Sequence, residues 1–389
     1  MVPRYSIDFT WRDLWRALKA PKQASVADME LWQHLGFTRH RVTWTRDGRT
    51  ALRLLLRAER IRPGEPVVVP RLTCEQVHRA IISEGSRLHF VDIRAGEFAP
   101  TAEDYAVAQK ESGARFVVAI SYWGMPFDIS ALRATLPDSV RIIQDCALSL
   151  GSWQRGVQDG VLADAAFFSF GPGKPMCLGL GGALAWRLSA FPELENRIKE
   201  GLTVPCQKHL AKRVLMRTWL KAVCFKDGLG YRFARTIVGN GTRKSRALVR
   251  DDSPLIGGLA WLGSCAEAKW GGIEAGARLR KERLDKIRGF LADGDCRFPP
   301  ACGAGVWNHW ICPFLIPERR PAGAVAAYLA RCGFETRSPY TEELTADALH
   351  GLDTNGLPNW LVTPSLNLLR NESLDRFATA LKKALKHDG

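Results

Sequence analysis

Residues 165–186 read AAFFSFGPGKPMCLGLGGALAW. Two apolar runs, 165–168 and 183–186, enclose a loop of glycines and prolines that holds a single lysine, Lys174. Short apolar runs bounded by Gly and Pro are typical of buried strands. A lysine held between them can be partly desolvated, which lowers its pKa and makes it an amine nucleophile. An isolated lysine is more often a surface residue, so Lys174 needs partners elsewhere in the chain.

The sequence on the N-terminal side of this stretch alternates strand and helix patterns. Apolar, β-branched runs occur at 67–69, 88–91, 116–120 and 140–143, and helical patterns occur at 50–59, 75–83 and 128–135. Apolar strands that alternate with helices form a parallel sheet covered on both faces. The sequence therefore predicts an α/β fold with a mostly parallel sheet in a large domain.

The remaining patterns divide the chain into five segments. We expect an N-terminal helical arm at 1–40, the large α/β domain at 41–200, a basic amphipathic insertion at 201–255, a linking helix (or two) at 256–291, and a smaller C-terminal α/β domain at 292–389. The last domain is expected because a strand–helix–strand pattern returns at 311–336 and a final amphipathic helix follows at 371–387.

Positive charge is concentrated in one segment. The 389 residues contain 55 Lys and Arg and 40 Asp and Glu, a formal charge of +15. Residues 201–250 hold twelve Lys or Arg and one acid, Asp227, which leaves +4 for the rest of the chain. Within them, 207–225 predicts an amphipathic helix with a cationic face. We expect no nucleic-acid partner, because the basicity is local and no nucleic-acid motif accompanies it.

Composition excludes several other classes of protein. Apolar residues make up 46% and charged residues 24%, as in ordinary globular proteins. The N-terminus has no apolar core of the kind that signal peptides have, and no run is long enough to predict a membrane span. The ten cysteines are scattered without ligand spacing, which favours reduced thiols and no metal. We expect a cytoplasmic protein.

Two further segments carry chemical side chains at the ends of predicted strands, where open parallel sheets bind ligands. Residues 47–52 form a Gly-containing turn that leads into a helix, and free amides at such a turn suit a phosphate. Asp145 follows the strand at 140–143 directly, and a buried acid there is costly unless it is paired. From spacing alone, a helix start at the first segment and an N-cap at Asp145 are the simpler interpretations.

Together, these three segments resemble the DegT/StrS family of sugar aminotransferases, which are pyridoxal-phosphate (PLP) enzymes of fold type I. The resemblance covers about 45–185 and extends to 62–70, Phe90-Val-Asp92, Tyr122-Trp-Gly124 with Asp128, and Gly181-Gly182. It is looser over 292–389, where residues 333–336 resemble the entry to the family's C-terminal strand. The resemblance implies a homodimer.

The resemblance also implies roles for individual residues. Lys174 would be the Schiff-base lysine that shuttles the proton, and Asp145 would keep the pyridine nitrogen protonated. Ser169 matches a phosphate-binding serine, and Arg49 and Thr50 occupy the family's phosphate turn, with arginine where threonine is more usual.

Several positions near the cofactor depart from the family pattern. Cys74 stands where an aromatic side chain commonly stacks on the cofactor ring, and Leu148 replaces a Gln or His near the cofactor's phenolic oxygen. The substrate contacts that the family suggests are Trp123, His309, Arg337 and Tyr340, although a core or interface role is the simpler interpretation of His309.

Two functional hypotheses follow. The first is an aminotransferase that moves an amino group, with glutamate as the expected donor, to a keto-sugar carried on a nucleotide, for polysaccharide or secondary-metabolite biosynthesis. The second is a catalytically weakened protein of the same fold whose basic segment binds an anionic membrane surface or partner. An active enzyme located peripherally at the inner face of the membrane would combine the two.

Overall fold

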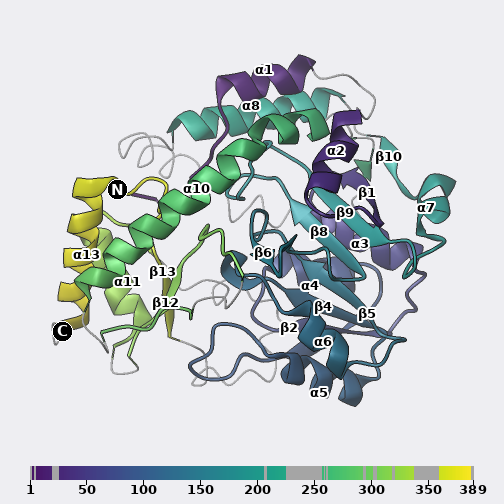
Figure 1. Ribbon diagram of the computed structural model, residues 1–389, viewed down its shortest axis with the longest axis horizontal. Helices are drawn as coiled ribbons and strands as arrows, with labels where there is room; N and C mark the ends of the chain where they lie inside the picture. The colour runs from purple at the N-terminus through teal and green to yellow at the C-terminus, as the bar shows by residue number, and fades with distance from the viewer. Residues whose placement is uncertain are drawn as a thin grey trace.

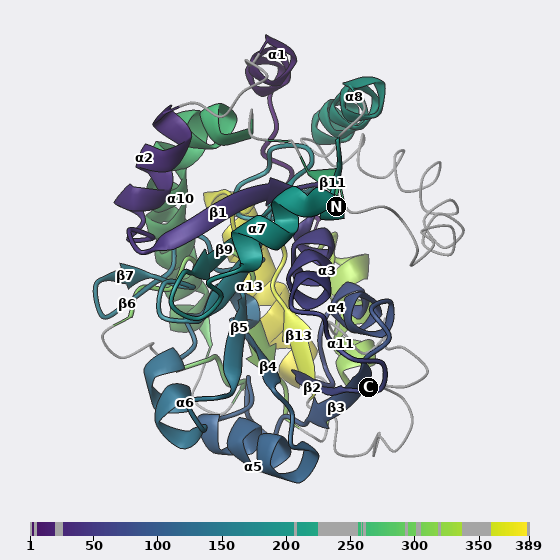
Figure 2. The same ribbon diagram turned by 90° about the vertical axis from the view of Figure 1, so that its right-hand side faces the viewer.

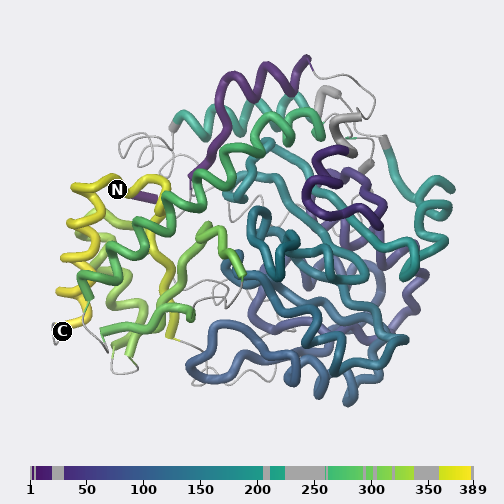
Figure 3. The backbone as a smooth tube through the Cα atoms, in the orientation of Figure 1, coloured from purple at the N-terminus to yellow at the C-terminus, as the bar shows by residue number. Residues whose placement is uncertain are grey.

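The computed structural model describes residues 2–3, 6–19, 26–205, 208–224, 256–257, 259, 262–291, 295–300, 305–317, 320–336 and 359–386. A larger half contains a seven-stranded sheet, and a smaller half contains the C-terminal elements; one long helix runs across both (Figure 1). The tube in Figure 3 shows the same division, with the yellow C-terminal segment gathered on one side of the molecule.

The large sheet has the strand order β1-β9-β8-β5-β4-β2-β3. Neighbouring strands from β8 to β3 are parallel, whereas β9 is antiparallel to both β8 and β1. The strands are β1 His40–Thr45, β2 Pro66–Pro70, β3 Arg87–Val91, β4 Phe116–Ile120, β5 Arg141–Asp145, β8 Ala165–Ser169 and β9 Gly182–Arg187. The predicted α/β fold with a mostly parallel sheet is confirmed.

Helices cover both faces of this sheet (Figure 2). Val67 and Val69 pack with α3 and α4, whereas Val68 between them packs with α5 and α6. Successive side chains of a strand point to opposite faces, so a strand covered twice must be apolar at every position. The helices are α3 Gly48–Ala58, α4 Glu75–Ile82, α5 Ala102–Ser112 and α6 Ile129–Thr135.

A second group of helices lies above the β1 edge of the sheet in Figure 1. These are α1 Trp11–Lys19, α2 Val26–His34, α8 Lys208–Cys224 and α10 Leu262–Phe290. Helix α1 packs against both α8 and α10. The Lys269 ammonium on α10 lies 3.1 Å from the buried Asp13 carboxylate on α1. Burial raises the pKa of Asp13, but bonds from Thr10 and the charge of Lys269 outweigh burial and hold it below its usual value.

The expected linking helix at 256–291 begins later than its sequence pattern indicates. Residues Ile256–Gly257 form a short strand, β11, parallel to β10 at Val204–Pro205, and the helix starts at Leu262. From Leu262 it continues as one element to Phe290.

In its described residues, the smaller half contains a two-stranded sheet and two helices. Strand β12 Pro313–Leu315 is antiparallel to β13 Trp360–Val362, and helices α11 Ala322–Arg331 and α13 Asn371–Lys386 pack together. The N-terminal Val2 forms a parallel bridge with Phe334, so the first residues lie beside the C-terminal helix (Figure 1). The remaining short elements are β6 Trp153–Gln154, β7 Val157–Gln158, η1 Tyr122–Gly124, α7 Leu194–Arg197 and η2 Ile198–Leu202.

Candidate active site

Three of the segments that stood out in the sequence meet at one edge of the sheet. Strands β5 and β8 are parallel neighbours, so their last residues, Asp145 and Ser169, lie at the same edge. Helix α3 begins beside them: a side chain built on Gly48 would lie 3.4 Å from the Ser169 Cβ atom and 3.3 Å from the Phe168 carbonyl oxygen. Loops at the carboxyl ends of parallel strands are the usual ligand site of an open α/β sheet.

Asp145 is a buried carboxylate with a raised pKa. It is 6% exposed, and its Oδ1 atom accepts a hydrogen bond of 2.9 Å from the Ala147 amide. Burial raises its pKa above the usual value, although the nearby positive charge of Lys174 and the Ala147 bond act in the opposite direction. Within the described part of the chain Asp145 forms no ion pair. A buried acid of this kind is suited to a cationic group on a ligand.

Lys174 lies on a loop that backbone hydrogen bonds close tightly between β8 and β9. The Phe170 amide donates to the Gly181 carbonyl at 2.8 Å, and the Leu178 amide donates to the Phe170 carbonyl at 2.9 Å. The smaller half holds the same loop, because the indole Nε1 of Trp310 donates to the Gly173 carbonyl at 2.9 Å. The lysine is therefore carried by a segment that is fixed from two sides.

The start of α3 is shaped by Asp47 and by Gly182. Asp47 is the N-cap: its Oδ1 atom accepts from both the amide and the hydroxyl of Thr50, each at 2.8 Å. Burial raises the pKa of Asp47, but the charges of Arg46 and Arg49 and the bonds from Thr50 outweigh it and lower the pKa overall. Gly182 is required because a Cβ atom there would come within 2.3 Å of the Asp47 backbone.

The other expected cofactor residues surround this edge. The Arg49 guanidinium donates to the Gln76 side chain at 2.7 Å, which ties α3 to α4. Cys74 is the half-buried N-cap position of α4, where the chain leaves β2. Leu148 is half-buried and follows Asp145 by three residues, and its carbonyl accepts from the Asn308 side-chain amide at 2.7 Å.

A second buried acid, Asp159, lies behind Asp145. Its carboxylate accepts from the Gln144 amide at 2.7 Å and contacts the Cys146 thiol at 3.8 Å, so it binds both neighbours of Asp145 in the sequence. Burial raises the pKa of Asp159 to about 6, even though the Ser121 and Ser149 hydroxyls and Gln144 donate to it. This cluster is well placed to fix the end of β5.

The expected substrate residues do not gather here as a set. Trp123 is fully buried, and its indole nitrogen donates to the Phe98 carbonyl at 2.9 Å, so its ring belongs to the core beside Trp360. We therefore do not propose Trp123 as a substrate contact. Arg337 and Tyr340 lie outside the described residues.

His309 lines a separate hollow of about 530 Å³ between α10 and the 305–309 segment, and neither Lys174 nor Asp145 lines that hollow. The His309 Nδ1 atom is buried without a hydrogen-bond partner. Burial, followed by the charge of Arg288, lowers the pKa of His309 to about 4, so the ring is neutral near pH 7. It packs 4.2 Å from the Trp307 ring, in agreement with a packing role.

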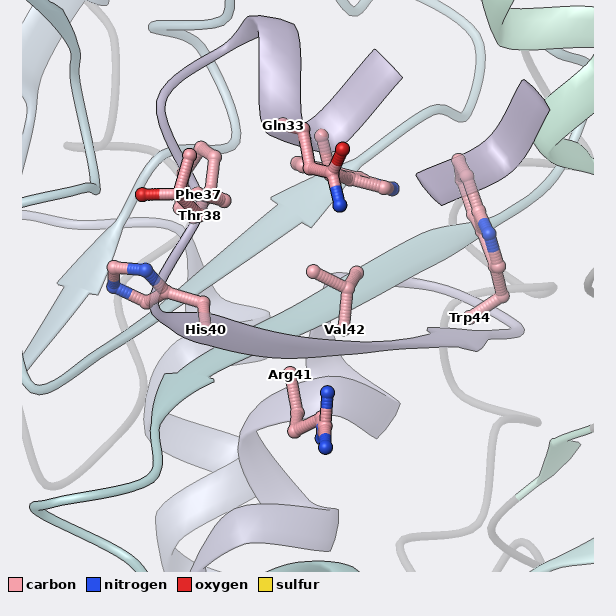
Figure 4. Close-up of a pocket in the computed structure, with 8 residues that line it drawn as sticks. Gln33, Phe37, Thr38, His40, Arg41, Val42 and Trp44 are labelled. Atoms are coloured by element: carbon pink, nitrogen blue, oxygen red, sulfur yellow. The ribbon is translucent and has the colours of Figure 1, made fainter. Parts of the chain in front are cut away.

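A smaller hollow of about 160 Å³ lies between α2 and the edge strand β1. His40, Val42 and Trp44 project from β1 on its side, whereas Arg41 points away from it (Figure 4). None of the residues at the Lys174 edge lines this hollow, so it is a surface recess of the large half.

Sequence patterns did not indicate Trp310, Asn308 or Asp159. Trp310 contacts a residue 137 positions away, and Asn308 donates to the carbonyls of Leu148 and Leu150, about 160 positions away. The one available signal was the composition of residues 307–310, Trp-Asn-His-Trp, whose polar and aromatic side chains interrupt an apolar strand pattern.

Similarity to known proteins agrees with this geometry. The model of the family described as DegT/DnrJ/EryC1/StrS aminotransferase matches residues 24–212. The chain is 29% identical over 173 residues to dTDP-4-dehydro-2,3,6-trideoxy-D-glucose 4-aminotransferase of Saccharopolyspora spinosa, which is 44% of each chain. It is 31% identical over 153 residues to UDP-N-acetyl-3-dehydro-alpha-D-glucosamine 3-aminotransferase of Acidithiobacillus ferrooxidans, which is 39% of this chain and 41% of the relative. The chain thus matches less than half the length of these relatives.

The whole fold is shared with solved structures. The PLP-form of Spr1654 from Streptococcus pneumoniae superposes with a TM-score of 0.71 at 17% identity, covering 99% of this chain and 98% of that one. This likeness shows that the fold extends well beyond the matched sequence segment. Among the described helices, none has the length and apolar character needed to cross a membrane.

Proposed function

We propose that the protein is a PLP-dependent aminotransferase, because the model of the DegT/DnrJ/EryC1/StrS aminotransferase family matches residues 24–212. Its reaction transfers an amino group, with glutamate as donor, to a keto-sugar carried on a nucleotide, in polysaccharide or secondary-metabolite biosynthesis. The observation that carries this proposal is the meeting of Asp145, Ser169 and the start of α3 at the sheet edge that bears the Lys174 loop.

The residues at this edge fit pyridoxal phosphate. Asp145, with its raised pKa and no ion pair among the described residues, suits a pyridine nitrogen that must stay protonated. Ser169 and the amides at the start of α3 suit the phosphate, since a helix N-terminus favours an anion. When bound, PLP supplies an electron sink that stabilises negative charge at a substrate carbon.

The chain's own groups have distinct tasks. The Asp145 carboxylate would hold a proton at the ring nitrogen, because burial makes it costly to leave either the carboxylate or the protonated nitrogen without the other. The Nζ atom of Lys174 accepts and returns a proton, which requires a neutral amine held in place by its loop. Thr50 supports the phosphate turn indirectly, since its hydroxyl is engaged by Asp47.

Two side chains make the surroundings of the ring unusual. Cys74 at the start of α4 offers a small thiol where a stacking aromatic ring is expected, and Leu148 offers an apolar group where a hydrogen-bond donor is expected. Both features favour a cofactor held chiefly through its phosphate and its ring nitrogen. They do not remove the acid, the lysine or the phosphate turn, so we favour an active enzyme over a catalytically weakened one.

The test is spectroscopic. Purified protein with added PLP should show an absorbance band near the visible edge that borohydride removes, with the label left on Lys174. Glutamate should convert the band to that of the pyridoxamine form. Lys174→Ala should lose the band and the label, whereas Lys199→Ala, which changes an exposed lysine paired with Glu195, should keep both. A normal band in Lys174→Ala would contradict the proposal.

We also propose that the enzyme works as a cytoplasmic homodimer. The family resemblance supports a dimer, and light scattering of the PLP-loaded protein should give twice the chain mass of 43.2 kDa. A monomer that turns over glutamate and keto-sugar at the full rate would refute the dimer and leave the chemistry intact.

A further inference from the structure

Helices α1 and α8 both carry a stripe of large apolar side chains that face solvent. The stripes repeat at intervals of four and three residues, so each follows one side of its helix. Their exposed fractions are Trp11 62%, Trp15 53% and Leu18 44% on α1, and Met216 44%, Leu220 51% and Val223 47% on α8. The side of each helix that lies opposite its stripe is buried, with Asp13 on α1 8% exposed and Thr218 on α8 3% exposed.

The two helices lie together at the outside of the molecule. They pack against each other, and both are at the upper edge of Figures 1 and 2. We call these six side chains the α1–α8 apolar surface. Isolated exposed apolar residues are ordinary, but six large ones on two neighbouring helices indicate an interaction site.

All exposed charge on the two helices is positive. The exposed cations are Arg12, Arg16 and Lys19 on α1 and Lys212, Arg213, Arg217 and Lys221 on α8. Helix α8 has no acidic residue, and the one acid of α1, Asp13, is buried against Lys269. The cations also support the aromatic rings: the Lys19 ammonium lies 4.4 Å from the Trp15 ring centre, and the Arg12 guanidinium lies 5.7 Å from that of Trp11.

We propose that the α1–α8 apolar surface docks the protein onto an anionic lipid bilayer, with Trp11, Trp15 and Leu220 entering the headgroup region. Tryptophan and leucine beside Lys and Arg is the pattern of helices that lie in a membrane interface, where apolar burial and attraction to anionic lipids add together. A second copy of the same surface would oppose cations to cations, which disfavours self-association through it.

The test is co-sedimentation with vesicles at physiological salt. The PLP-loaded protein should bind phosphatidylcholine vesicles that contain about one third phosphatidylglycerol, and should not bind phosphatidylcholine alone. The double variant Trp11→Ser with Trp15→Ser should bind about tenfold more weakly, because two interfacial anchors are lost. Lys212→Glu with Arg217→Glu should weaken binding most at low salt, and the difference from the wild type should shrink as salt rises, because salt screens the attraction that the variant has lost.

The matched control is Val107→Ser with Leu188→Ser, which removes two exposed apolar side chains elsewhere, 57% and 39% exposed, and should leave binding unchanged. Circular dichroism and the visible band report that every variant is folded. The docking proposal fails if the wild type stays in the supernatant with anionic vesicles, or if the tryptophan variant binds like the wild type. It also fails if the tryptophan variant changes the oligomeric state, because the surface would then be a subunit interface.

Failure of the membrane-docking proposal can be distinguished from failure of the proposed aminotransferase reaction. Lys174→Ala should bind vesicles like the wild type, since Lys174 lies on the loop between β8 and β9 and not on α1 or α8. The tryptophan variant should aminate a soluble keto-sugar at the wild-type rate.

Discussion

Trp310 and Trp307 are three positions apart and make the same kind of bond to different places. The Trp310 indole donates to the Gly173 carbonyl, next to Lys174, whereas the Trp307 indole donates to the Trp123 carbonyl in the core, at 3.0 Å. The Arg280 guanidinium lies 5.2 Å from the Trp310 ring centre and supports that ring from behind. Trp310 therefore contacts the loop that carries Lys174, whereas Trp307 contacts the core.

Trp310→Phe keeps an aromatic ring and removes only the donor. We expect PLP affinity to fall by about two- to tenfold, since a net hydrogen bond contributes about 0.5–1.5 kcal/mol. Trp307→Phe should cost a similar amount of stability but leave PLP affinity unchanged. Titration of the apoprotein with PLP measures both, and equal losses in the two variants would contradict a special role for Trp310.

Asp159 predicts an unusual dependence of stability on pH. Its pKa is about 6 in the folded chain and near 3.8 when unfolded. Below about pH 4 both states are protonated, and above that pH the unfolded chain loses its proton first, so rising pH favours unfolding. The higher pKa in the folded chain lowers the free energy of unfolding by about 3 kcal/mol, and this loss is complete only above about pH 6. Asp159→Asn should gain stability relative to wild type from pH 4 to 6 in urea unfolding, and parallel profiles would refute this.

At the scale of whole elements, the close approach of β9 to the start of α3 shapes the turn where we propose that the phosphate binds. Gly182→Ala would place a methyl group 2.5 Å from the Asp47 carbonyl oxygen and 2.7 Å from the Gly48 amide nitrogen. Helix α3 must then shift, and we expect a loss of about 1–3 kcal/mol in stability.

The same shift should weaken PLP binding at least about tenfold, because it displaces the start of α3, where we propose that the phosphate binds. Gly171→Ala is the control in the same loop, since nothing lies within 4 Å of its new methyl group, and it should change stability by less than about 1 kcal/mol. Calorimetry and PLP titration of the two variants measure the difference. A Gly182→Ala protein that binds PLP normally would show that the turn tolerates the shift.

Elements with a strong local signal were predictable from the sequence. The apolar runs of β4 and β8 and the helical pattern of α8 placed those elements to within about three residues, because periodicity is a local property. Asp145 and Lys174 were singled out differently: local pattern favoured an N-cap and a surface lysine, and only the family resemblance gave them roles at a cofactor, which stay predictions. Strand β11 and the parallel bridge of Val2 to Phe334 were not, because the latter pairs residues more than 300 positions apart and leaves no local pattern.

At the scale of the whole molecule, α10 runs across both halves, and Arg280 on it is a buried cation that bonds to segments of the smaller side. Arg280 is 4% exposed; its Nε atom donates to the Asn308 carbonyl at 2.8 Å and its Nη1 atom to the Asn367 side chain at 3.1 Å. Burial lowers its pKa to about 10, so it stays charged near pH 7. Each acceptor lies in the smaller half or in the segment that enters it.

Arg280→Met should leave both acceptors unsatisfied and cost about 2–4 kcal/mol. Because the lost bonds join the two halves, we expect the single unfolding transition to broaden or divide in urea. Arg278→Met, an exposed arginine two positions away, should unfold like the wild type. A sharp transition in Arg280→Met, displaced but not broadened, would mean that the halves are joined chiefly by other contacts.

The bond from Trp310 to the loop that carries Lys174 also shows which parts of the chain must be present together for function. The family model matches residues 24–212, which hold the sheet, Asp145 and Lys174. Yet the donor that steadies the lysine comes from a segment almost a hundred positions beyond that stretch. A chain truncated near residue 212 would therefore keep the segment that the family model matches but lose the Trp310 donor, and we expect it to be inactive. Exchange of domains between relatives should succeed only when both residues of the contact, Trp310 and Gly173, come from the same protein.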